Sequence, residues 1–79
     1  MFFYTYVLQS KKDGYLYIGW TNNLRKRFDD HNLGNVEATK SRVPFEIIYY
    51  EACKSKQNAI AREKQLKSGY GRRYLKTRM

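Results

Sequence analysis

The sequence predicts an α+β fold within the α/β class: a three-stranded antiparallel sheet flanked by helices, in the order strand, strand, helix, strand, helix. Two runs of alternating side chains, residues 2–9 and 15–20, flank an Asp-Gly turn, which is a strong hairpin signal. A third run, 45–50, is rich in aromatic and β-branched residues. Segments 24–32 and 56–68 instead have helical spacing and good helix formers.

The hairpin sets its own register, because side chains alternate with period two along a strand. With the turn at residues 11–14, Leu8 faces Tyr17 and Tyr6 faces Gly19. Tyr6 and Tyr17 then become diagonal neighbours on one face of the sheet, roughly 7 Å apart at the backbone. The glycine opposite Tyr6 is expected to leave open space above the sheet.

The helix predicted over 24–32 follows three successive capping candidates, residues 21–23. Leu24 and Phe28, four residues apart, start the stripe that should dock on the sheet. Gly34 supplies the left-handed residue expected where such a helix stops.

Arg27 and His31 share one face of this helix, about 60° around from the docking stripe. That position places them at the seam between helix and sheet. Two ordinary interpretations remain open: Arg27 as a solvated charge paired with Asp30, and His31 as a cap for carbonyls at the helix end.

The second helix should begin after Ser55 and end at Gly69. Its packing face spans roughly 120° and is formed by Ala59, Ile60, Leu66 and Tyr70. Glu63 lies in the middle of that face, where an unpaired buried charge would be costly. It therefore needs a salt bridge to Arg27, a bound cation, or a rim position that reaches solvent.

A formal charge of +9 and a pI near 9.9 predict a polyanionic partner for this single domain of residues 1–79. The candidate phosphate-binding residues are Lys40 and Arg42 in the loop 33–44, and Arg72 and Arg73 in the tail, which is either a short C-terminal helix or a frayed arm. A generic basic domain is the bland alternative. No signal peptide or membrane span is expected, and the lone Cys53 suggests a reducing compartment, so we expect a cytoplasmic protein.

Two tyrosines, an arginine, a histidine and a lone carboxylate suit phosphodiester hydrolysis better than binding alone. Such a reaction must deprotonate a water, meet the charge on the phosphoryl oxygens and stabilise the leaving oxygen. With one carboxylate in position, a single cation such as Mg²⁺ would be held by Glu63, waters and the phosphate.

These residues resemble the GIY-YIG nuclease superfamily. Tyr4-Thr5-Tyr6 and Tyr17-Ile18-Gly19 look like the two halves of its signature, and the stretches LYIGWTNNLRKRFDDHN and AIAREKQLKSG look like its small stand-alone members. Those members are similar to the catalytic module of the excision-repair incision subunit. The resemblance implies cleavage of a nucleic-acid strand with Mg²⁺ or Mn²⁺.

By that resemblance, Glu63 is the metal ligand, Arg27 meets the scissile phosphate, and His31 is a secondary helper. Tyr6 is favoured as the base, with its pKa lowered from about 10 by the cation and Arg27, and Tyr17 as its positioning partner. The expected substrate is DNA rather than RNA, in repair or processing, with a larger repair complex as a candidate partner and the oligomeric state open. A non-catalytic nucleic-acid-binding domain and a protein-interaction module are the alternatives.

Overall fold

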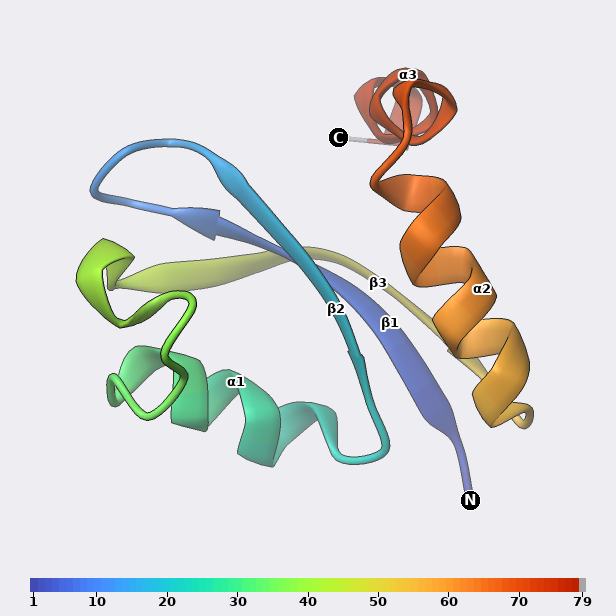
Figure 1. Ribbon diagram of the computed structural model, residues 1–79, viewed down its shortest axis with the longest axis horizontal. Coiled ribbons are helices and arrows are strands. Elements are labelled where there is room, and N and C mark those ends of the chain that lie inside the picture. Colours follow the sequence, from blue (N-terminus) through green and yellow to red (C-terminus); the bar gives the residue numbers. More distant parts are fainter. Residues whose placement is uncertain (79) are drawn as a thin grey trace.

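The computed structural model describes residues 1–78, which form three strands and three longer helices (Figure 1). Along the chain these are β1 (Phe3–Ser10), β2 (Leu16–Thr21), α1 (Leu24–Asn32), a short 3₁₀ turn (Lys40–Arg42), β3 (Phe45–Cys53), α2 (Lys56–Leu66) and α3 (Gly69–Arg78). The sheet is antiparallel in the order β2-β1-β3. The predicted α+β fold is therefore confirmed, with strand ends shifted by a few residues.

The hairpin register is as predicted from side-chain alternation: Tyr6 pairs with Gly19 and Leu8 pairs with Tyr17. The first helix also begins and ends as predicted. The Asn23 side chain accepts a hydrogen bond from the Lys26 backbone N–H at its start, and Gly34 follows its end with φ of 79°.

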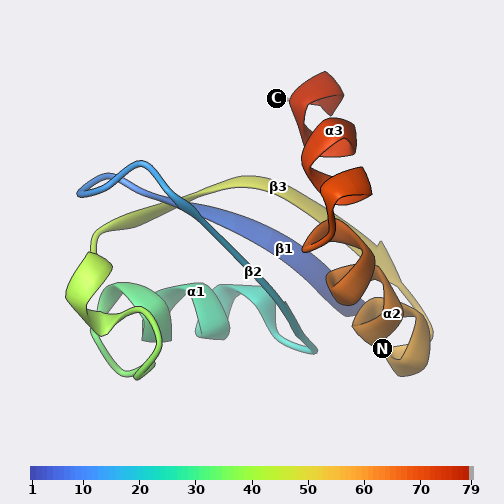
Figure 2. The same ribbon diagram turned by 45° about the horizontal axis from the view of Figure 1, so that its top comes forward.

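The central strand β1 buries both of its faces, each against a different set of helices (Figure 2). Tyr6 and Leu8 pack with Phe45 on the face that α1 covers. Val7 packs with Leu66 and Leu75 on the face that α2 and α3 cover. Each face thus has its own small apolar core.

The helix predicted to end at Gly69 ends slightly earlier, because α2 stops at Leu66 and Gly69 is the first residue of α3. The Ser68 hydroxyl donates to the Gln65 carbonyl at 2.5 Å and accepts from the Gly71 N–H at 3.3 Å, which stabilises the corner. A side chain at Gly71 would collide with the Leu66 backbone. This corner turns Tyr70 outward, 49% exposed, so its predicted place on the packing face is wrong.

The basic tail is a ten-residue helix, α3, rather than a frayed arm. Leu75 is 1% exposed and anchors it in the core. Arg62 of α2 stacks on the Tyr74 ring at 4.4 Å and donates to both oxygens of Glu51 at 2.9 and 2.8 Å. Tyr49 donates to the same carboxylate. Together these contacts tie α2 and α3 to β3.

None of the helices within residues 1–78 combines the length and the apolar character needed to span a bilayer.

Candidate active site

Tyr6 lies at the centre of the face covered by α1, and its ring fits over the bare backbone of Gly19. A Cβ atom at Gly19 would lie 2.6 Å from the Tyr6 hydroxyl oxygen and 2.8 Å from Cζ. The prediction of open space opposite Tyr6 is therefore wrong, because the Tyr6 ring itself fills that space. With 1% of its surface exposed, Tyr6 is held in one position.

His31 holds the Tyr6 hydroxyl from the opposite side. Its Nε2 lies 2.9 Å from the Tyr6 oxygen, and its Nδ1 lies 2.8 Å from the Thr39 hydroxyl. When that hydroxyl donates to the Val36 carbonyl at 3.4 Å, it accepts from Nδ1, which then carries the proton, and Nε2 accepts from Tyr6. The fully buried His31 is thus not a helix cap, as the ordinary interpretation supposed.

The electrostatic environment keeps this histidine neutral. Burial, followed by the positive charge of Arg27, lowers the pKa of His31 from 6.5 to about 4. At neutral pH the imidazole is therefore an uncharged hydrogen-bond partner of the phenol.

Tyr17 completes an aromatic cluster with these two rings. The Tyr6 and Tyr17 ring centroids are 6.5 Å apart, as the diagonal register predicted, and the Tyr17 ring meets the His31 ring edge-on at 4.9 Å. Tyr17 is half-buried, so it lies between the buried Tyr6 and the solvent.

Arg27 brings its positive charge to the Tyr6 phenol. Hydrogen bonding with Tyr6 raises the pKa of Arg27, and the same contact acts to lower the pKa of Tyr6. Burial has the larger effect, however, so the protein's own groups together leave the pKa of Tyr6 above its ordinary value. The predicted lowering involves a bound cation as well as Arg27, and it stays a prediction. Asp30, the predicted ordinary partner of Arg27, instead pairs with Lys26 at 2.9 Å.

Glu63 reaches the same region from α2. Its side chain is 19% exposed, and within residues 1–78 its one ion pair is a loose contact of 3.7 Å with the Lys67 amine. The Glu63 charge acts on Tyr6 and raises its pKa. Of the three interpretations, the Arg27 salt bridge is therefore wrong, whereas a rim position and a bound cation both remain.

The site residues fit a cation that retains most of its water. Within residues 1–78, no three His, Cys, Asp or Glu side chains gather closely enough to form a metal cage. Mg²⁺ is commonly held by one or two carboxylates together with water and substrate phosphate. Glu63 is a carboxylate of that kind, half-buried and weakly paired.

The candidate phosphate-binding residues have different surroundings. Arg42 donates to Asp13 at 2.9 Å and lies over the Phe45 ring, so it ties the loop to the hairpin instead of standing free for a phosphate. Lys40 makes an exposed surface pair with Glu37. On α3, both Arg72 and Arg73 are exposed.

Comparisons with known proteins agree with this geometry. A family model described as the GIY-YIG catalytic domain matches residues 2–76. The chain belongs to the GIY-YIG family. GIY-YIG catalytic domains form a nuclease-type family whose members typically use a divalent metal.

Several relatives carry the name UPF0213. One, from Clostridium perfringens, is 43% identical over 65 residues, which cover 81% of this chain and 69% of that protein. Another, from Syntrophus aciditrophicus, is 41% identical over 66 residues, covering 81% of this chain and 75% of that protein. The solution structure of a UPF0213 protein from Bacillus halodurans matches with a TM-score of 0.60 at 31% identity, covering 98% of this chain and 84% of that chain. Its fold agrees with the sheet and helices described above.

Sequence reasoning missed Thr39, the residue that fixes the His31 ring. The loop that carries it shows no strand or helix periodicity. The one available signal is the spacing of Val36 and Thr39, the kind that buries one side of a helical turn, and both are indeed buried.

Proposed function

We propose that this protein hydrolyses phosphodiester bonds in nucleic acid, with one divalent cation, Mg²⁺ or Mn²⁺, held by Glu63. The observation that carries the proposal is the buried Tyr6 hydroxyl, which lies 2.9 Å from His31 Nε2 and whose pKa is raised by burial even as interaction with Arg27 acts to lower it. A buried phenol with a neutral imidazole at its hydroxyl and an arginine charge acting on it has the partners that proton transfer requires.

In this proposal Tyr6 first releases its own proton to solvent, and the resulting phenolate is the base that takes a proton from the attacking water. Tyr17 positions Tyr6. The pair of His31 and Thr39 can support both forms of Tyr6. With its proton on Nδ1, His31 accepts from the phenol; with its proton on Nε2, it donates to the phenolate, because the Thr39 hydroxyl can either accept or donate.

Arg27 would neutralise charge on the scissile phosphate, since its positive charge already acts on Tyr6 and His31. A bound cation would supply Lewis-acid stabilisation of the phosphoryl and leaving oxygens. Glu63 would hold that cation at the rim of the same site, and its loose pair with Lys67 leaves carboxylate oxygen available.

The test is incubation of the purified protein with flapped, branched and single-stranded DNA and RNA, in the presence of Mg²⁺ or Mn²⁺. We expect cleavage by the wild-type protein, and loss of at least about a hundredfold in rate for Glu63→Ala. Glu46→Ala, which removes an exposed carboxylate on β3, is the matched control and should retain activity. Cleavage that persists in Glu63→Ala would refute the proposal, whereas binding without cleavage would favour the non-catalytic alternative.

For the substrate we propose DNA rather than RNA, in repair or processing intermediates, with a larger repair complex as a candidate partner. The basic charge and the free Cys53 are consistent with action on nucleic acid in the cytoplasm.

A further inference from the structure

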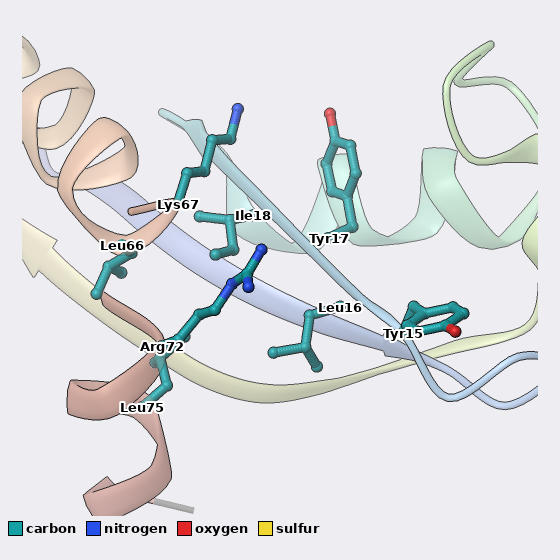
Figure 3. Close-up of a pocket in the computed structure, with 8 residues that line it drawn as sticks. All are labelled: Tyr15, Leu16, Tyr17, Ile18, Leu66, Lys67, Arg72 and Leu75. Carbon is teal, nitrogen blue, oxygen red and sulfur yellow. The ribbon is translucent and has the colours of Figure 1, made fainter. Parts of the chain in front are cut away.

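A groove of about 580 Å³ lies between β2 and the corner where α2 meets α3 (Figure 3). Its floor is aliphatic and consists of Leu16, Ile18, Leu66 and Leu75. Leu16 is 36% exposed. The volume is within the range of sites that hold small organic molecules, so it can receive a flat, largely apolar group.

Positive charge borders this floor. Lys67 and Arg72 line the groove, and Figure 3 shows the Arg72 side chain reaching from α3 towards β2. Within residues 1–78 no carboxylate forms an ion pair with Arg72. The apolar floor is complementary to the face of a nucleotide base, and the cationic wall is complementary to the anionic phosphate.

The groove adjoins the proposed catalytic site at two points. Lys67 lines the groove and also lies 3.7 Å from Glu63. Tyr17 borders the groove as well, and its ring packs on His31. A strand whose phosphate sits at Tyr6 and Glu63 therefore has the groove directly beside it.

Tyr15 stands at the rim of the groove with 73% of its surface exposed. A tyrosine at a nucleic-acid surface offers a ring on which a base can stack. Bases in a duplex are already stacked and paired, so a floor and ring of this kind select an unpaired base.

We infer that this groove binds an unpaired nucleotide next to the scissile phosphate, with Arg72 on its phosphate and Tyr15 against its base. This inference rests on the proposed function for the position of the phosphate. It makes single strands and unpaired flaps the substrate class of this protein, and it assigns different roles to the adjacent Arg72 and Arg73.

The test measures binding of a fluorescent single-stranded DNA oligonucleotide by anisotropy, with EDTA present so that no strand is cut. Arg72→Ala should weaken binding by about fivefold or more and make its salt dependence shallower by about 0.7 in logarithmic slope. Tyr15→Ala should weaken binding by about fivefold or more. Arg73→Ala, the same change at the next position of α3, should alter affinity less than about twofold.

NMR titration of the same oligonucleotide locates the binding surface. We expect the largest amide shifts at Leu16, Ile18 and Arg72, and blunt duplex should bind more weakly than the single strand. Equal losses for Arg72→Ala and Arg73→Ala, equal affinity for duplex, or equal competition by polyglutamate would each overturn the inference.

The experiments give different results if the groove assignment is wrong and if the proposed hydrolysis is wrong. If the protein cleaves the strand with Mg²⁺ or Mn²⁺ but the NMR amide shifts lie away from the groove, only the assignment of the groove is overturned. If the NMR amide shifts lie at the groove but the wild-type protein does not cleave, the proposed hydrolysis is overturned. The groove is then supported as a binding site for unpaired nucleotides.

Discussion

Gly19→Ala tests the geometry of the Tyr6 site directly, because it adds one methyl group at the point of closest contact. The new Cβ would lie 2.8 Å from Tyr6 Cζ, where carbon atoms pack favourably at about 3.5 Å or more. The Tyr6 ring must therefore move by about 0.7 Å, and with 1% of its surface exposed it has no free space to enter.

Two consequences follow from that displacement. Overpacking of this kind costs about 1–3 kcal/mol, which should lower the melting temperature by at least about 4 °C in a domain of this size. A displacement of about 0.7 Å would also distort the hydrogen bond from the Tyr6 hydroxyl to His31, now 2.9 Å. Misplacing a catalytic group by this amount should reduce the cleavage rate by about tenfold to a hundredfold.

Thermal unfolding and initial cleavage rates would measure the two effects, and the ¹⁵N shifts of the His31 ring would report the hydrogen bond. Gly69→Ala is the matched control, since a Cβ there meets nothing within 4 Å and should leave both quantities unchanged. If Gly19→Ala changes stability by less than about 0.5 kcal/mol and retains full activity, the close fit of Tyr6 over Gly19 is not what positions the phenol.

Two further predictions concern stability. Because the pKa of His31 falls from 6.5 to about 4 on folding, its neutral form contributes about 3 kcal/mol that is fully present above pH 6.5 and is lost as the pH falls towards 4. Urea unfolding between these pH values should show that loss in the wild-type protein, and an equally steep decline in His31→Gln would contradict it. Glu51→Ala should cost about 1–3 kcal/mol by leaving the Arg62 guanidinium unpaired, as measured by thermal unfolding. Glu37→Ala, which removes only an exposed surface pair, should cost less than about 0.5 kcal/mol, and equal losses would argue against the Glu51 network as the anchor of α3.

The sequence predicted best those features that depend on near neighbours. Side-chain alternation and one Asp-Gly turn are sufficient to place Tyr6 opposite Gly19, because the strand period leaves no freedom once the turn length is known. In the same way, a spacing of four residues put Arg27 and His31 on one helix face, next to the hairpin tyrosines.

Features that depend on close contact between distant atoms could not be predicted in this way. The tight corner between α2 and α3 depends on Gly71 lying against the Leu66 backbone, whereas the sequence indicated only that the helix stops near Gly69. Arg42 looked free because its partner, Asp13, lies in a turn 29 residues earlier. Charge alone cannot separate a cation that ties a loop in place from one that awaits a phosphate.

Glu63 shows how a local misfit becomes interpretable once the fold is known. In the sequence it was a carboxylate in an apolar stripe, and nothing local identified what it faced. In the fold its charge raises the pKa of Tyr6 while Arg27 acts to lower it, so the two opposing charges act on one phenol. Burial nevertheless has the largest effect on that phenol and the Glu63 charge the smallest, so under the proposed function a bound cation would make Tyr6 more acidic mainly through its own charge.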